Sequence, residues 1–291
     1  MKRTLVAIFL ASFAASLAAQ QGVAPDPRVH KFLARERAGA GSFLDTDLAR
    51  SSGVTYHGGP VLVQARMVYI FWGPSFSVLT SSDYTYAQNL QAFRDQYGTS
   101  PEYNILTQYY QIVSGVKQFI ELTNLAAGTA DLFDTSTPPT NVTDADVQAE
   151  VMKYLTTHTV DYSTIYAVVI PSTSYSSDGG EDSCGGPNLA YCAYSSWFGS
   201  GSTAVKYTIQ PYASCSGCQM SGWTPAQNEE HFIVHEVGDT VTNPVGTGWF
   251  SATTGEGVED VCAWSPPPFL SGGYGYQYQW SNAASGCVKT R

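Results

Sequence analysis

The most informative segment of the chain reads His231-Phe-Ile-Val-His235-Glu236-Val-Gly-Asp239-Thr-Val-Thr-Asn-Pro244. It places two imidazoles and a carboxylate at intervals of four residues, with another carboxylate directly after the second imidazole. Positions four apart lie on one face of a helix. His231, His235 and Asp239 would therefore form one polar stripe. A His-Glu pair followed one turn later by another ligand-type residue is typical of a zincin-like active-site helix.

The residues before this segment form a strong helix start. Thr224 is a good cap, Pro225 suits the first helical position, and Gln227 stands three residues after the cap. Pro244 disfavours helix at the residue before it. The pattern predicts a helix from Thr224 to about Val241.

A bound cation would account for this stripe. His235 and Asp239 lie one helical turn apart, so both could bind one ion. Glu236 lies about 100° round the helix, where a carboxylate acts as general base towards a metal-bound water. We therefore expect Zn²⁺, with Glu236 as the catalytic residue. A further ligand must come from the candidates Glu256, Glu259, Asp260 and His231.

Two alternatives stay open. Carboxylate-rich sites also suit Ca²⁺, which prefers oxygen ligands, and Glu236 would then be a ligand. Without any metal, the helix would simply present a hydrated polar face. Asp239 lies near the predicted helix C-terminus, where the helix dipole disfavours an anion. A bound cation would relieve that conflict.

The N-terminal residues predict export. Lys2 and Arg3 precede an apolar run and then small residues, which is typical of a secretory signal peptide over residues 1–18. Residues 19–54 are predicted to be a flexible lead-in or a removable pro-segment, and residues 55–291 a single domain. We expect a secreted monomer, extracellular or periplasmic. No segment is long and apolar enough to predict a membrane span.

Composition excludes some partners. Among the 291 residues, 13% are charged, the net charge is −10, and the basic residues form no cluster. Binding to nucleic acid requires positive charge to offset phosphate, so we exclude that class of partner. The expected partner is instead a peptide or a cell-wall or other extracellular polymer.

Six cysteines in an exported chain predict up to three disulfides. Proximity in sequence favours the pairs 184–192, 215–218 and 262–287. Cys215-Ser-Gly-Cys218 has no second such motif and no thioredoxin-like context. We therefore expect structural disulfides here, and neither a redox motif nor a zinc knuckle.

Helical and strand patterns alternate along the chain. Strands are predicted over residues 61–72, 117–123, 165–170 and 204–212. Helices are predicted near residues 29–37 and over 83–97, 143–158 and 224–241, with another opening at Ser100-Pro101, while residues 172–202 read as a long loop. This order predicts an α/β domain with a mixed β-sheet flanked by helices.

Several segments together resemble the EXORDIUM-like, phosphate-induced proteins of plants and their bacterial relatives. The stretch from His235 to Pro244 is similar to that family's signature His-Glu-x-x-Glu-x-x-Thr-(Asn/Asp)-Pro. Further similar segments are Tyr56-His-Gly-Gly-Pro60, Val68-Tyr-Ile-Phe-Trp72, Gly248-Trp-Phe250, Glu259-Asp-Val-Cys262 and Trp280-Ser-Asn282 with Cys287.

The resemblance covers about residues 55–290 and implies a secreted, bacterial-type member. The positions that match the family's motif residues are His235, Glu236, Asp239, Thr242, Pro244 and Asp260. Two positions depart from the family pattern, since Asp239 and Gly257 stand where the family has glutamate; Glu256 or Glu259 could substitute for the latter.

Together these observations predict a secreted metal-dependent hydrolase, of the zinc peptidase or amidase type. The alternative is a non-catalytic extracellular or cell-wall-associated binding protein with a structural calcium site.

Overall fold

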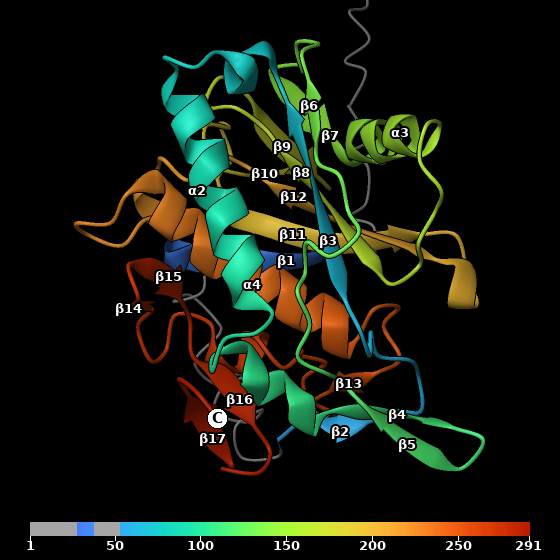
Figure 1. Cartoon of the computed structure of the whole chain (residues 1–291). Helices are drawn as coiled ribbons and strands as arrows, with labels where there is room; N and C mark the ends of the chain where they lie inside the picture. Colours follow the sequence, from blue (N-terminus) through green and yellow to red (C-terminus); the bar gives the residue numbers. More distant parts are fainter. Residues whose placement is uncertain (1–27, 38–52) are drawn as a thin grey trace, which may run out of the picture.

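A mixed β-sheet forms the centre of the molecule (Figure 1). The computed structural model describes residues 28–37 and 53–291. Within them, the main sheet has the strand order β1-β11-β12-β8-β3-β6. Its strands are β1 (His30–Leu33), β11 (Tyr191–Phe198), β12 (Val205–Gln210), β8 (Thr164–Val169), β3 (Arg66–Trp72) and β6 (Leu132–Asp134). The pairs from β12 to β6 are parallel, whereas β11 runs antiparallel to both of its neighbours.

Helices cover both faces of this sheet, as the sequence predicts. Helices α2 (Ser82–Tyr97) and α4 (Pro225–Thr242) pack on one face, and α3 (Asp144–Leu155) packs on the other. Strand β3 shows why, since its side chains alternate between the two faces. Tyr69 joins the cluster that contains α2 and α4, and Val68 joins the cluster that contains α3. The fold is thus mixed α/β.

Smaller sheets and short helical turns surround this core. The remaining strands are β2 (Thr55–Tyr56), β4 (Tyr110–Val113), β5 (Val116–Phe119), β7 (Asn141–Thr143), β9 (Tyr175–Asp178), β10 (Glu181–Asp182), β13 (Trp249–Phe250), β14 (Phe269–Ser271), β15 (Tyr274–Tyr276), β16 (Gln279–Ser281) and β17 (Gly286–Val288). The 3-10 turns are η1 (Pro74–Ser77), η2 (Tyr103–Gln108), η3 (Gly201–Thr203), η4 (Ser216–Cys218) and η5 (Asp260–Cys262). Within the described residues, none of the helices has the length and apolar character needed to span a membrane.

Helix α4 begins and ends as predicted. The Thr224 side chain accepts a hydrogen bond from the Gln227 backbone N–H. The Gln227 side chain accepts one from the Thr224 backbone N–H in return. This capping box satisfies two amide groups that a helix start otherwise leaves unpaired. The helix ends at Thr242, just before Asn243-Pro244.

Two predictions from local sequence are wrong. Most of the short helix expected near residues 29–37 is strand β1 instead, which pairs with β11, and within that range residues 35–37 alone are helical. The long loop expected over residues 172–202 contains β9, β10 and all of β11. Strand β11 is buried along most of its length, so it lacks the alternating polar pattern that marks a half-exposed strand. The signal-peptide prediction for residues 1–18 lies outside the described residues.

The disulfide pairing also differs from the prediction. Cys262 pairs with Cys287 as expected, but the other bonds join Cys184 to Cys215 and Cys192 to Cys218. All six cysteines are bonded, which confirms the predicted number of three disulfides. The pairing predicted from proximity in sequence is wrong because the chain after Cys184 soon enters the extended strand β11, which carries Cys192 away from Cys184. That strand lies beside η4, so both bonds connect segments distant in sequence.

Candidate metal centre

Three candidate ligand groups meet at the middle of α4. His235 and Asp239 project from the helix, and Asp260 approaches from η5. The His235 Nε2 atom lies 3.3 Å from Asp239 Oδ2 and 3.2 Å from Asp260 Oδ1. The ligand atoms of the three residues all lie within 4.8 Å of one another. The fold therefore brings together three of the ligand candidates that the sequence supplies.

The spacing of these atoms fits a small tetrahedral cation. Ligand atoms about 2.1 Å from a tetrahedral zinc ion lie about 3.4 Å apart. The two measured distances from the imidazole are close to that value. Asp239 Oδ2 is buried and makes no hydrogen bond within the described residues. A calcium ion takes six to eight oxygen ligands, so one imidazole and two carboxylates suit it less well.

Further groups hold the ligands in place. The Asp239 carboxylate accepts from the Glu259 backbone N–H at 2.9 Å. The Gln277 side-chain N–H₂ donates to the Glu259 carboxylate at 2.6 Å, which leaves the Gln277 carbonyl oxygen facing His235 Nδ1 at 3.3 Å. With its Nδ1–H directed at this oxygen, the imidazole presents Nε2 to both aspartates. Such a partner on the other ring nitrogen is usual for a metal-binding histidine.

The charges in this group are strongly coupled. Burial opposes a charged His235, but Asp239 and Asp260 outweigh it and raise the pKa of the imidazole to about 10. Burial and the repulsion of Asp260 raise the pKa of Asp239 to about 7. Burial acts in the same direction on Asp260, but the hydrogen bond to His235 prevails and lowers its pKa. The protonated imidazole thus balances the two aspartates, a role that a bound cation would take over.

Glu236 lies beside the three ligand groups without a fixed partner. Its side chain is fully buried, and neither carboxylate oxygen makes a hydrogen bond within the described residues. Burial raises its pKa to about 8, against the opposing effects of His235 and the Ser195 hydroxyl of β11. A carboxylate with a pKa near neutrality can accept and return a proton efficiently. The carboxylate predicted as general base therefore has a suitable environment.

The other candidate residues occupy different places. His231 is fully buried among aromatic rings, and its nearest ring partner is Phe232 at 4.1 Å. Burial is the main reason that its pKa falls to about 3. Glu259 packs under Gly238 and supports the site through Gln277. Glu256 lines a cavity of about 200 Å³ together with His235 and Asp260. The structure thus keeps His231 and Glu259 out of the ligand group and leaves Glu256 at its rim.

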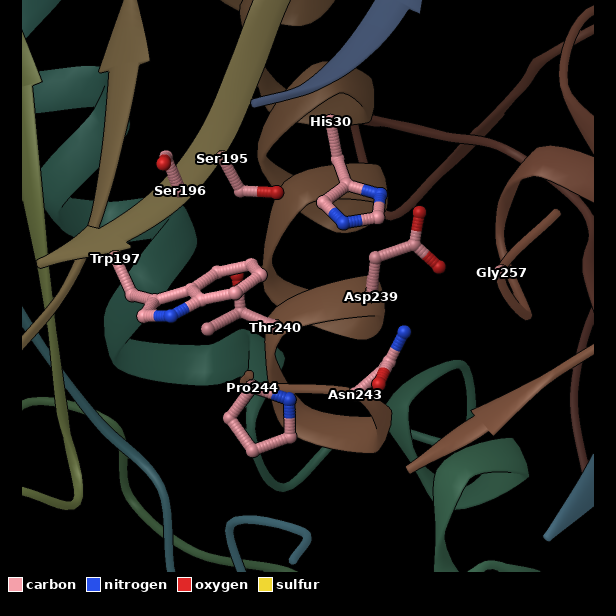
Figure 2. A pocket seen from close by; sticks show the side chains of 9 residues that line it. All are labelled: His30, Ser195, Ser196, Trp197, Asp239, Thr240, Asn243, Pro244 and Gly257. Atoms are coloured by element: carbon pink, nitrogen blue, oxygen red, sulfur yellow. The ribbon is translucent and has the colours of Figure 1, made fainter. Parts of the chain in front are cut away.

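Three residues beside the centre are not predicted by the sequence. Figure 2 shows the His30 imidazole of β1 lying beside Asp239, with Ser195 of β11 close by. The cavity that they line holds about 10 Å³, which is room for about one water molecule. The third residue that the sequence does not predict is Gln277, which faces His235 Nδ1. His30 carried a possible signal, as one of five histidines in the chain, but it falls in the predicted lead-in.

Comparison with known proteins gives no match, so the functional interpretation rests on the geometry of the site. No family model matches the chain, and neither a curated protein nor a solved structure matches it.

Proposed function

We propose that this chain is a secreted zinc-dependent hydrolase of the peptidase or amidase type. The observation that carries the proposal is the joint placement of three ligand groups and one buried, unpaired carboxylate. His235, Asp239 and Asp260 supply the nitrogen and oxygen donors of a catalytic zinc site. Glu236 follows directly on the same helix.

Each residue has a defined role in this proposal. A zinc ion bound here would supply Lewis acidity and lower the pKa of a water molecule towards neutrality. His235, Asp239 and Asp260 hold the ion, and Gln277 and Glu259 orient two of these ligands. Glu236 takes the proton from the attacking water and delivers it to the leaving amine. The buried surroundings exclude bulk water and strengthen these electrostatic effects.

Export and family membership are parts of the same proposal. Three disulfides are compatible with an oxidising compartment, and the N-terminal sequence has the pattern of a signal peptide. The resemblance to the EXORDIUM-like family is part of this proposal, and its two departures, Asp239 and Gly257, lie against each other in the fold. A Cβ atom on Gly257 would lie 2.8 Å from Asp239 Cγ, so the two departures are in contact.

Metal content tests the proposal directly. We expect about one zinc per chain in the purified protein and a loss of affinity of at least 10-fold in His235→Ala. His158→Ala is the matched control, because that imidazole stacks on Tyr154 far from the centre in sequence and packing. The measurement is elemental analysis, followed by competition with a chelator.

Three results would separate the hypotheses. Zinc that is lost only in His235→Ala supports the hydrolase. Calcium lost in the same way would favour the non-catalytic binding protein, with Glu236 as a further ligand. Wild-type protein that takes up neither metal would contradict both.

Gly257 gives a second test of the same centre. We expect Gly257→Ala to weaken zinc binding by about 10-fold to 100-fold, because the new methyl group would press on the Asp239 carboxylate. Gly286→Ala is the control, since the nearest atom to its added Cβ is 3.9 Å away. Chelator competition gives both affinities. Equal affinities would mean that Asp239 is not a ligand.

A further inference from the structure

Strand β1 lies across the candidate metal centre. It pairs antiparallel with β11 at the edge of the main sheet, with His30 opposite Ser195 and Phe32 opposite Ala193 (Figure 1). Within the part of the chain that the structure describes, β1 is the edge strand of that sheet and pairs with β11 alone. Residues 28–37 belong to the region that the sequence predicts as lead-in or pro-segment. The strand therefore occupies the position beside α4 that an extended peptide could take.

The side chains of β1 fill separate sites in alternation. Phe32 points at the centre, and its ring packs edge-on against His235 with the centroids 4.4 Å apart. The Lys31 ammonium group lies on another side, 2.8 Å from Asp178 and 3.0 Å from Glu181. Alternation of this kind is how a strand added to a sheet edge gains side-chain specificity.

Two further aromatic rings pack against Phe32. Its ring centroid lies 5.0 Å from Phe232 and 5.1 Å from Trp264. The Trp264 indole N–H also donates to the Leu33 carbonyl at 2.8 Å. Phe32 is almost fully buried, whereas the next side chain, Leu33, is 40% exposed. One aromatic side chain of β1 therefore anchors the strand.

The strand closes access to the centre. With β1 in place, His235 is 2% exposed and Glu236 is fully buried. The cavity next to His235 and Asp260 is lined by Lys31, Phe32 and Leu33, and the small cavity beside Asp239 is lined by His30. A polymeric substrate could reach the ligand residues along this edge only if β1 moved away.

We propose that β1 is an intramolecular ligand, and that an extended peptide with a basic residue followed by an aromatic one binds β11 in its place. The assignment of this peptide as substrate rests on the proposed function; its binding does not. Backbone pairing with β11 supplies affinity, the Phe32 site selects an aromatic side chain, and Asp178 with Glu181 selects a cation.

Exchange of β1 for a free peptide tests this inference in the full-length protein. A protease recognition sequence is inserted between Gly39 and Ala40, outside the described residues, and the purified protein is cut. A fluorescent peptide of residues 28–37 is then added with chelator present, and fluorescence anisotropy reports its binding. We expect binding to the cut protein and at least 10-fold weaker binding to the uncut chain, because tethered β1 competes at a high effective concentration.

Variant peptides show whether the β1 site is the one occupied. The Phe32→Ala peptide should bind about 30-fold or more weakly, as expected for loss of a buried aromatic anchor. The Leu33→Ala peptide is the matched control and should bind within about threefold, because Leu33 is 40% exposed and lies outside the buried cluster that contains Phe32. Equal binding of the Phe32→Ala peptide would overturn the inference.

Two further readouts complete the test. Circular dichroism must show that the cut protein stays folded when the fragment exchanges; unfolding would mean that β1 is a permanent part of the core and would overturn the inference. Hydrolysis of a peptide substrate by the zinc-loaded protein should rise after cutting. Peptide exchange without any hydrolysis would uphold the inference and count against the proposed function.

Discussion

Replacing Glu236 with glutamine should lower kcat by about 100-fold to 10,000-fold while the metal content stays unchanged. The amide keeps the size of the side chain but cannot accept a proton. Glu236 is fully buried beside the Ser195 hydroxyl, and an amide oxygen can still accept from that hydroxyl, so the exchange should disturb the packing little. Elemental analysis and steady-state kinetics on the same preparation measure both quantities.

The fold should tolerate this substitution. Burial raises the pKa of Glu236 to about 8, so the folded state favours the neutral carboxyl group over the charged one. The free energy of unfolding therefore falls as the pH rises from the ordinary pKa of 4.5 to about 8, and a neutral amide removes this cost. The expected loss of activity is therefore not a loss of structure, and thermal unfolding at pH 8 should show a melting temperature that does not fall.

Glu229→Gln is the matched control for the same helix. Glu229 is also fully buried, and burial raises its pKa well above the usual range, but it lies two turns earlier beside Tyr86. We expect its kcat to stay within about threefold of wild type, since it contacts none of the ligand groups. Full activity in Glu236→Gln would remove the proposed mechanism.

Removing the disulfide between Cys192 and Cys218 should lower the free energy of unfolding by about 3–4 kcal/mol, the expectation for a closed loop of this length. The two cysteines are 26 residues apart. Both are buried in a cluster that also contains Phe32 and Phe232. The double variant Cys192→Ala/Cys218→Ala is measured by chemical denaturation at neutral pH.

The third disulfide supplies an internal comparison. Cys262 and Cys287 are 25 residues apart, so the loop entropy of their bond is nearly the same. Cys287 is only partly buried, and its removal leaves the Phe32 cluster untouched. We expect a smaller loss for Cys262→Ala/Cys287→Ala. A larger loss than for the Cys192–Cys218 pair would show that burial does not govern these contributions.

Much of the candidate site could be predicted because it is local in sequence. The capping box at Thr224 and the four-residue spacing from His235 to Asp239 depend on contacts within one helix. Helical geometry alone places these two groups one turn apart, and Glu236 follows directly. The third group, Asp260, was one of several candidates, because a ligand from another segment has no fixed spacing.

The remainder depended on contacts between distant residues. Strand β1 meets β11 across more than 150 residues, and neither strand has the alternating pattern that identifies a half-exposed strand. His30 therefore lies beside the candidate metal centre because of a pairing that no local pattern indicates. The disulfides of Cys184 and Cys192 also join residues that are 31 and 26 positions apart in the sequence. Thus the sequence by itself determined the helix and its chemistry, whereas the tertiary structure decided which residues surround it, because sheet pairing depends on the whole chain.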